Sequence, residues 1–203
     1  MIYLVAHAAR VSALLGQHVV LVAVSLAIAL VIALPLGTTA ARHPRAGTLI
    51  LATAGILYTI PSLALLALLV AAIGLGPSTA IVALVVYAQM ILIRAVVAGL
   101  RGVDPALVDA ARGMGLSARQ TLLRVEFPAA LPVMLAGVRV AAVTLVALAT
   151  VAAWIDAGGL GVLLFEGILT QNDDKIVAGA LAAAALAIVA DLALRGCERA
   201  VRR

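Results

Sequence analysis

The amino-acid sequence predicts an all-α membrane protein with about five transmembrane helices, formed by one transmembrane domain over residues 1–203. Of these residues 66% are hydrophobic and 11% are charged, and the mean hydropathy is +1.24. Soluble domains contain roughly 45–50% apolar residues, so a water-soluble fold is excluded. Aromatic residues make up only 3% of the chain. The aromatic girdles and alternating strands of a membrane β-barrel are therefore missing from the sequence, and helices remain.

Five apolar stretches are each long enough to cross about 30 Å of hydrocarbon as a helix. They lie at about residues 19–40, 48–72, 79–100, 131–153 and 176–194. Residues 1–18 contain Arg10, Gln17 and His18 and are too interrupted to span, so an amphipathic helix at the membrane interface is expected there. The membrane core is thus placed at about residues 17–194.

The distribution of arginine predicts how the spans are oriented. Arginines gather after the first, third and fifth spans: Arg42, Arg45, Arg101, Arg112, Arg119, Arg124, Arg195, Arg199, Arg202 and Arg203. Basic residues are retained on the cytoplasmic side, so these segments should be cytoplasmic, with the N-terminus outside and the C-terminus inside. The net charge of +5 is explained by this topology and gives no reason to expect a nucleic-acid partner.

The segment of residues 101–131 is too long for a simple connection and should have its own structure. Asp104-Pro105 is typical of a helix start, and Gly113 and Gly115 supply residues that tolerate the left-handed conformation at its end. Ser117 and Gln120 have capping-box spacing, which predicts a second short helix that stops near Phe127-Pro128. A rigid unit of helix, glycine joint and helix is expected on the cytoplasmic side.

Three charged residues lie within the predicted spans, where charge must face protein or water. Arg94 and Asp191 are close enough to the cytoplasmic boundary for their side chains to snorkel toward water. For Arg139, a buried structural ion pair is favoured over a solute contact.

The predicted outer segment of residues 154–175 contains Gly158, Gly159 and Gly161 among apolar residues. A re-entrant or surface elbow covered by protein is expected, because irregular backbone at that depth needs internal partners. The acidic residues of this segment would also suit the docking of an extracytoplasmic protein, and for Asp173 and Asp174 a simple exposed loop is an equally open interpretation.

Sites of catalysis or metal binding are not indicated by the sequence. The single cysteine, Cys197, supports neither an internal disulfide nor a zinc site. His7, His18 and His43 lack metal-ligand spacing and are expected at the membrane interface. A phosphate-binding G-x-x-x-x-G-K-[ST] loop and a Ser/His/Asp arrangement are both absent, so neither ATP hydrolysis nor an intramembrane enzyme is predicted.

One motif in the cytoplasmic segment resembles a known family. Asp109-Ala110-Ala111, three residues, Gly115, nine residues and Val125-Glu126-Phe127-Pro128 resemble the "EAA" loop of permease subunits of ATP-binding-cassette importers. Asp109, Val125 and Phe127 replace Glu, Ile and Leu of the family pattern. Further stretches look like the branch that transports glycine betaine, choline and carnitine: Thr59–Leu65, Arg101–Pro105, Asp156–Gly161, Asn172-Asp173 and Ala178–Ala180.

This resemblance implies a type I importer fold similar to that of methionine importers, in the bacterial inner membrane. It implies two permease subunits, identical or paralogous, two ATPase subunits that carry ATP and Mg²⁺, and an extracytoplasmic substrate-binding protein. No cofactor is expected in this chain. The resemblance assigns coupling to the ATPase to seven residues: Asp109, Ala110, Ala111, Gly113, Gly115, Val125 and Pro128. The small alanines would let the helix seat in an ATPase cleft, and Asp109 would accept a charge-assisted hydrogen bond.

Pro61, inside the second predicted span, frees a backbone carbonyl near Leu57. A kink there would shape the translocation path, together with Tyr58, Thr59, Ser62 and Tyr87. A packing kink without solute contact is an equally open interpretation. Because the chain has few aromatic residues for a cation-binding cage, affinity for a quaternary ammonium ion is expected mainly in the binding protein.

Three alternative functions remain open at this point. A secondary transporter or channel would suit an interrupted helix at Pro61 but not the coupling motif. A membrane-embedded enzyme would need converging polar residues. Within the importer class, the solute could instead be another compound, such as an amino acid.

Overall fold

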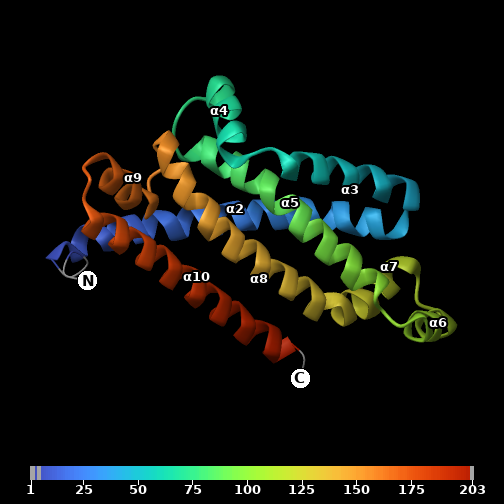
Figure 1. Ribbon diagram of the computed structural model, residues 1–203. Coiled ribbons are helices and arrows are strands. Elements are labelled where there is room, and N and C mark those ends of the chain that lie inside the picture. The colour runs from blue at the N-terminus through green and yellow to red at the C-terminus, as the bar shows by residue number, and fades with distance from the viewer. Residues whose placement is uncertain (1–2, 4–5, 202–203) are drawn as a thin grey trace.

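The computed structural model describes Tyr3 and residues 6–201, and the regular structure in this part of the chain is helical (Figure 1). The elements in chain order are α2 (Ala8–Arg42), α3 (Pro44–Thr59), α4 (Ser62–Ile73), α5 (Pro77–Arg101), α6 (Pro105–Gly113), α7 (Ala118–Thr121), a π-helical segment (Leu122–Glu126), α8 (Phe127–Ala152), a 3₁₀ turn (Ala153–Ile155), α9 (Gly161–Leu169) and α10 (Asp173–Val201). In this part of the chain four helical runs are long and apolar enough to span a membrane, and the bent pair of α3 and α4 brings the number to as many as five. The predicted all-α membrane fold is confirmed.

Helix α5 lies at the centre of the bundle and packs against α2, α3, α4 and α8, while α10 packs on α8 and α9. Figure 1 shows α9 and the first turns of α2 at one end of the molecule, and α6 and α7 at the other. These are called the α9 end and the α6 end below. The core between the helices consists largely of alanine, leucine and valine, including Ala29, Ala33, Ala141 and Leu145, which are fully buried.

Glycines allow the central helices to approach closely. A Cβ atom built on Gly137 of α8 would lie 2.1 Å from the Cβ of Ala95, and one on Gly37 of α2 would lie 2.5 Å from the Cβ of Val96. Both contacts are too short for any side chain larger than hydrogen. Small residues at such crossings are the usual means of packing helices in a membrane, where burial of apolar surface contributes little.

The first helix is longer than predicted. Helix α2 begins at Ala8 and continues without a break to Arg42, so the prediction of a separate interfacial helix is wrong for residues 8–18; Met1, Ile2, Leu4 and Val5 lie outside the described residues. The polar side chains that suggested an interface have partners within the protein instead. His18, also predicted at the interface, is fully buried.

The second predicted span is broken into two helices. α3 ends at Thr59 and α4 begins at Ser62, and their axes differ by 96°. Ile60 has the extended conformation that precedes proline, with ψ of 126°. The kink predicted at Pro61 is therefore confirmed, and it separates two helices instead of bending one.

The prediction that the second short helix stops near Phe127-Pro128 is wrong. Helix α7 continues through the π-helical segment directly into α8, so the fourth span begins at Phe127 instead of about residue 131. The N–H of Phe127 donates to the carbonyl of Leu122, five residues earlier. This wider turn changes the hydrogen-bond register just before Pro128, and its missing N–H then falls in the first turn of α8, where proline is tolerated.

Candidate functional site

Two tyrosines meet at the break between α3 and α4. The rings of Tyr58 and Tyr87 are edge to face, with centroids 5.9 Å apart and planes at 74°. The Tyr87 hydroxyl donates to the carbonyl of Ile60, which lies in the break itself. Tyr87 is buried, whereas the Tyr58 side chain is 42% exposed. An aromatic surface of this kind can attract a cation, and quaternary ammonium groups are typical ligands.

The structure places the five predicted path residues around this break. Ser62 and Tyr87 line a small cavity with apolar residues of α4, α5 and α8: Leu66, Ala83, Leu84, Leu148 and Ala152. Pro61 forms the turn between the two helices. The hydroxyl of Thr59 donates to the carbonyl of Ile56 at 2.7 Å, so Thr59 supplies a hydrogen bond to a backbone carbonyl at the end of its own helix. Tyr58, Ser62 and Tyr87 are thus the members that lie together.

At the α6 end, the capped helices form where the sequence predicts them. The Asp104 carboxylate accepts the N–H of Ala106 at 2.9 Å and starts α6. Ser117 and Gln120 form both hydrogen bonds of a capping box at the start of α7. Gly115 has a φ of +83°, while Gly113 is the last residue of α6 and has no positive φ. The predicted left-handed role is confirmed for Gly115 and wrong for Gly113.

The coupling residues expected from the family motif differ in exposure. Asp109 and Ala110 are exposed, as are the apolar side chains of Leu107 and Met114 on the same unit. Ala111 is buried, and its carbonyl accepts the N–H of Leu116 across the joint. Ala111 therefore packs the unit internally.

The remaining motif residues connect the α6 unit, which consists of α6, the joint at Gly115 and α7, to the bundle. Val125 is half-buried in the π-helical segment and Pro128 is exposed at the start of α8. The adjacent Glu126 accepts a hydrogen bond from Arg42 at 2.9 Å, which ties the end of α2 to this segment. Movement of α6 and α7 would thus reach α8 and α2 directly.

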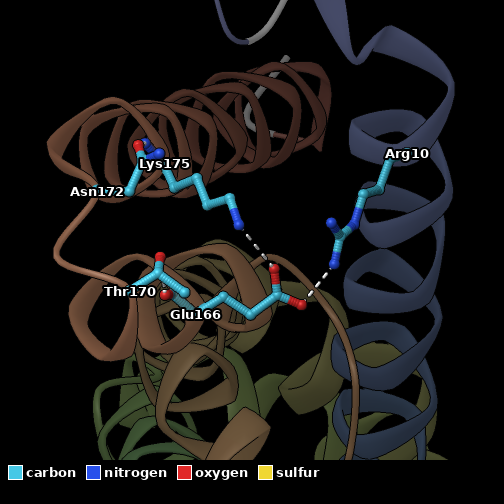
Figure 2. Close-up of polar contacts among 5 residues, drawn as sticks. All are labelled: Arg10, Glu166, Thr170, Asn172 and Lys175. Atoms are coloured by element: carbon cyan, nitrogen blue, oxygen red, sulfur yellow. Dashed lines mark hydrogen bonds and ion pairs between the residues drawn. The ribbon is translucent and has the colours of Figure 1, made fainter.

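At the α9 end, one carboxylate connects three helices. Figure 2 shows Glu166 of α9 between Arg10 of α2 and Lys175 of α10. The Lys175 ammonium lies 3.6 Å from the Glu166 carboxylate, and the Arg10 guanidinium donates a hydrogen bond to it. The backbone N–H of Lys175 also donates to the Asn172 side chain, at the start of α10.

A second set of contacts holds the backbone ahead of α9. Gly158 and Gly159 have φ of +76° and +81°. The N–H of Gly159 donates to the Gln17 side chain at 3.1 Å, and the N–H of Leu160 donates to Nδ1 of His18 at 3.2 Å. The other His18 nitrogen, Nε2, is 3.1 Å from the carbonyl of Val146 in α8. The predicted elbow covered by protein is confirmed here, while Asp173 and Asp174 are exposed in the first turn of α10.

The roles of Gln17 and His18 were missed by sequence reasoning, which placed them in an interfacial helix. The available signal was the Gly158-Gly159 pair, whose backbone N–H groups need acceptors at membrane depth. Nothing in the sequence connects that need with residues 142 positions away.

Arg139 joins α8 to α10. Its Nε lies 2.9 Å from the Asp191 carboxylate and its Nη1 donates to Glu198 at 3.1 Å. The structural ion pair favoured from the sequence is confirmed, but its predicted burial is wrong for Arg139 and Asp191, whose side chains are 30% and 38% exposed.

Comparisons with known proteins show which family and which permeases this chain is similar to. A family model described as "binding-protein-dependent transport system inner membrane component" matches residues 33–203. The carnitine transport permease protein OpuCB of Listeria monocytogenes is 36% identical over 182 residues, which are 90% of this chain and 84% of that protein. The osmoprotectant import permease protein OsmW of Salmonella typhimurium is 38% identical over 194 residues, 93% of this chain and 90% of that protein.

Among solved structures, inward-facing MetNI, a methionine ABC transporter, has the same fold. One of its chains matches with a TM-score of 0.88 and 23% identity, and the match covers 96% of this chain and 97% of that chain. The fold predicted to be similar to methionine importers is confirmed.

Proposed function

Because this chain belongs to the family of binding-protein-dependent transport system inner membrane components, we propose that it imports a quaternary ammonium osmoprotectant: glycine betaine, choline or carnitine. The family predicted from the motif spacing is confirmed, and the chain is a transmembrane permease subunit whose ATPase is a separate protein. The observation that supports the solute class is the 36% and 38% identity to a carnitine permease and an osmoprotectant permease, each over at least 90% of this chain.

In this proposal the α6 unit couples the permease to the ATPase. Its exposed surface, with Asp109, Ala110, Leu107 and Met114, combines a hydrogen-bond acceptor with apolar contacts. The partner would bind this surface, and Gly115 would set the angle between α6 and α7. Val125 and Pro128 would transmit the resulting movement to α8.

The solute path in this proposal passes the break between α3 and α4. Tyr58, Ser62 and Tyr87 are polar or aromatic side chains in an otherwise aliphatic region, and Thr59 and Pro61 shape the turn beside them. Tyr58 is exposed, Ser62 is half-buried and Tyr87 is buried. One subunit has too few inward faces to enclose a path alone, so two permease subunits, identical or paralogous, would pair around it. The complete importer would add two ATPase subunits, with ATP and Mg²⁺, and an extracytoplasmic binding protein.

The proposed orientation in the bacterial inner membrane places the N-terminus and α9 outside, and α6 and the C-terminus in the cytoplasm. Its support is the concentration of arginine at the α6 end. Exposed positions suited to labelling exist on both sides, Ala118 in α7 and Asp174 in α10.

A membrane-impermeant maleimide tests this orientation in intact cells. The single native cysteine, Cys197, is exposed and is first replaced by serine. We expect Asp174→Cys to be labelled in intact cells and Ala118→Cys only after permeabilisation. Labelling of Ala118→Cys from outside would reverse the topology.

The solute class is tested on the assembled importer. The chain is tagged and purified with its partner subunits, and ligand binding to the co-purified binding protein is measured by calorimetry. We expect binding of glycine betaine, choline or carnitine. Binding of an amino acid such as methionine, without any quaternary ammonium compound, would overturn the proposed solute class and leave the permease assignment intact.

A further inference from the structure

Arg94 in α5 is a charged residue without a partner among the residues that the structure describes. Its side chain is exposed, and within the described part of the chain it forms no hydrogen bond or ion pair. Seven residues, about 10 Å of helix, separate it from Arg101 at the end of α5. A charged side chain at this depth must face water or protein instead of lipid. Arg139 meets this requirement through two carboxylates, whereas Arg94 has none.

The neighbours of α5 define the face on which Arg94 lies. Glycines show where each helix touches α5: Gly37 of α2 packs on Ile93 and Val96, Gly137 of α8 on Ile91 and Ala95, and Gly55 of α3 near Met90. At 3.6 residues per turn, Tyr87 and Arg94 share nearly the same direction. That direction lies between the contacts to α3 and α8 and opposite α2.

Arg94 therefore lies on the same face as the tyrosine pair but nearer the α6 end. Fourteen residues, about 21 Å of helix, separate Tyr87 from Arg101, and the same number separates Tyr58 from Pro44 at the start of α3. The aromatic pair is thus about 10 Å further from the α6 end than Arg94. Helical side chains lean toward the N-terminus of their helix, which for Arg94 is the direction of Tyr87, so the lean shortens this separation.

We propose that Arg94 binds the carboxylate of a zwitterionic quaternary ammonium solute while the exposed ring of Tyr58, held edge to face against the buried Tyr87, faces its ammonium group. This inference rests on the proposed function and adds the solute feature that the permease itself selects. A guanidinium binds a carboxylate through two parallel hydrogen bonds, and aromatic rings attract the methylated cation. Because Arg94 repels a bare cation, the site favours glycine betaine or carnitine over choline, which has a hydroxyl where the zwitterions have a carboxylate.

The test compares two solutes in the complete importer reconstituted in proteoliposomes. ATP-driven uptake of glycine betaine and of choline is measured for the unaltered chain, Arg94→Gln and Arg94→Lys. We expect Arg94→Gln to lower the ratio of betaine to choline uptake about tenfold, because the charge-assisted pair is lost while the glutamine amide can still donate a neutral hydrogen bond. Choline uptake should be maintained or increased. Arg94→Lys keeps the charge but loses the planar fork, so an intermediate ratio is expected.

Arg45→Gln is the matched control. Arg45 is exposed in the first turn of α3 and its replacement removes the same charge at the α6 end. Its uptake ratio should equal that of the unaltered chain. An equal fall in both uptakes with Arg94→Gln, or an unchanged ratio, would overturn the inference. If Arg94→Gln does not insert, an unchanged ratio in Arg94→Lys overturns it instead. Failure of the unaltered importer to take up either solute would refute the proposed function itself.

Discussion

Gly115→Val is expected to reduce solute uptake and solute-stimulated ATP hydrolysis together, by about tenfold or more, in an importer that still inserts in the membrane. Gly115 has a φ of +83°, a conformation that strains a β-branched residue by about 1–3 kcal/mol. A Cβ atom at this position meets nothing within 4 Å, so the effect comes from the backbone alone. The chain would relieve the strain by reorienting α6 relative to α7. Uptake and ATPase rates of the reconstituted importer measure the result.

Gly196→Val is the control for this prediction. Gly196 lies within α10, its φ is ordinary, and a Cβ atom there also meets nothing within 4 Å. Normal activity is expected for this variant. The coupling role of the joint would be disproved if Gly115→Val, expressed at the normal level, transported at the unaltered rate. Asp109→Lys should reproduce the loss, because it places a cation where the proposed contact with the ATPase requires an acceptor.

Gly137→Ala is expected to destabilise the helix bundle by about 1–3 kcal/mol, because it overpacks the crossing of α5 and α8. The new Cβ would lie 2.1 Å from the Cβ of Ala95. Ala95 has no side-chain torsion that could relieve this contact, so the two helices must separate along their length. Thermal unfolding of the purified permease in detergent, followed by circular dichroism, should show a lower midpoint.

The same substitution at Gly55 provides the comparison. Gly55 also lies between two helices, but its added Cβ would be 3.6 Å from the terminal methyl of Met90, an ordinary contact. Gly55→Ala should therefore unfold near the temperature of the unaltered chain. Equal midpoints for the two variants would show that the α5–α8 crossing adjusts without loss.

Features that depend only on residues close together in the sequence were predictable. Asp104 and Ser117 start α6 and α7 as expected because a cap needs only its own side chain and N–H groups two or three residues later. Pro61 likewise ends α3 by removing a donor and restricting the residue before it. The direction of α4 after that break was not predictable, because it depends on contacts such as Tyr87 to Ile60.

The predictions that were wrong depend instead on contacts between residues far apart in the sequence or on an irregular helical turn. His18 looks polar and interfacial, yet its partners Val146 and Leu160 lie more than 100 residues away, and only the folded bundle brings them together. Phe127-Pro128 looks like a helix end, yet a π-helical turn carries the chain past it. At the candidate path, composition predicted which residues are unusual, but not that Arg94 and Tyr87 lie in nearly the same direction around α5.

The clamps on both ends of α2 have a mechanical consequence. This helix of 35 residues, about 52 Å long, remains unbroken past Pro35. Gln17 and His18 fasten one end to the backbone before α9, and Arg42 fastens the other to Glu126. A displacement of Glu126 would therefore be transmitted along the rigid helix α2 to the opposite end of the molecule. We expect each of the two proposed permease subunits to move as a rigid body. The hinge of the transport cycle would then lie between the subunits. The path could not be open to both sides of the membrane at the same time.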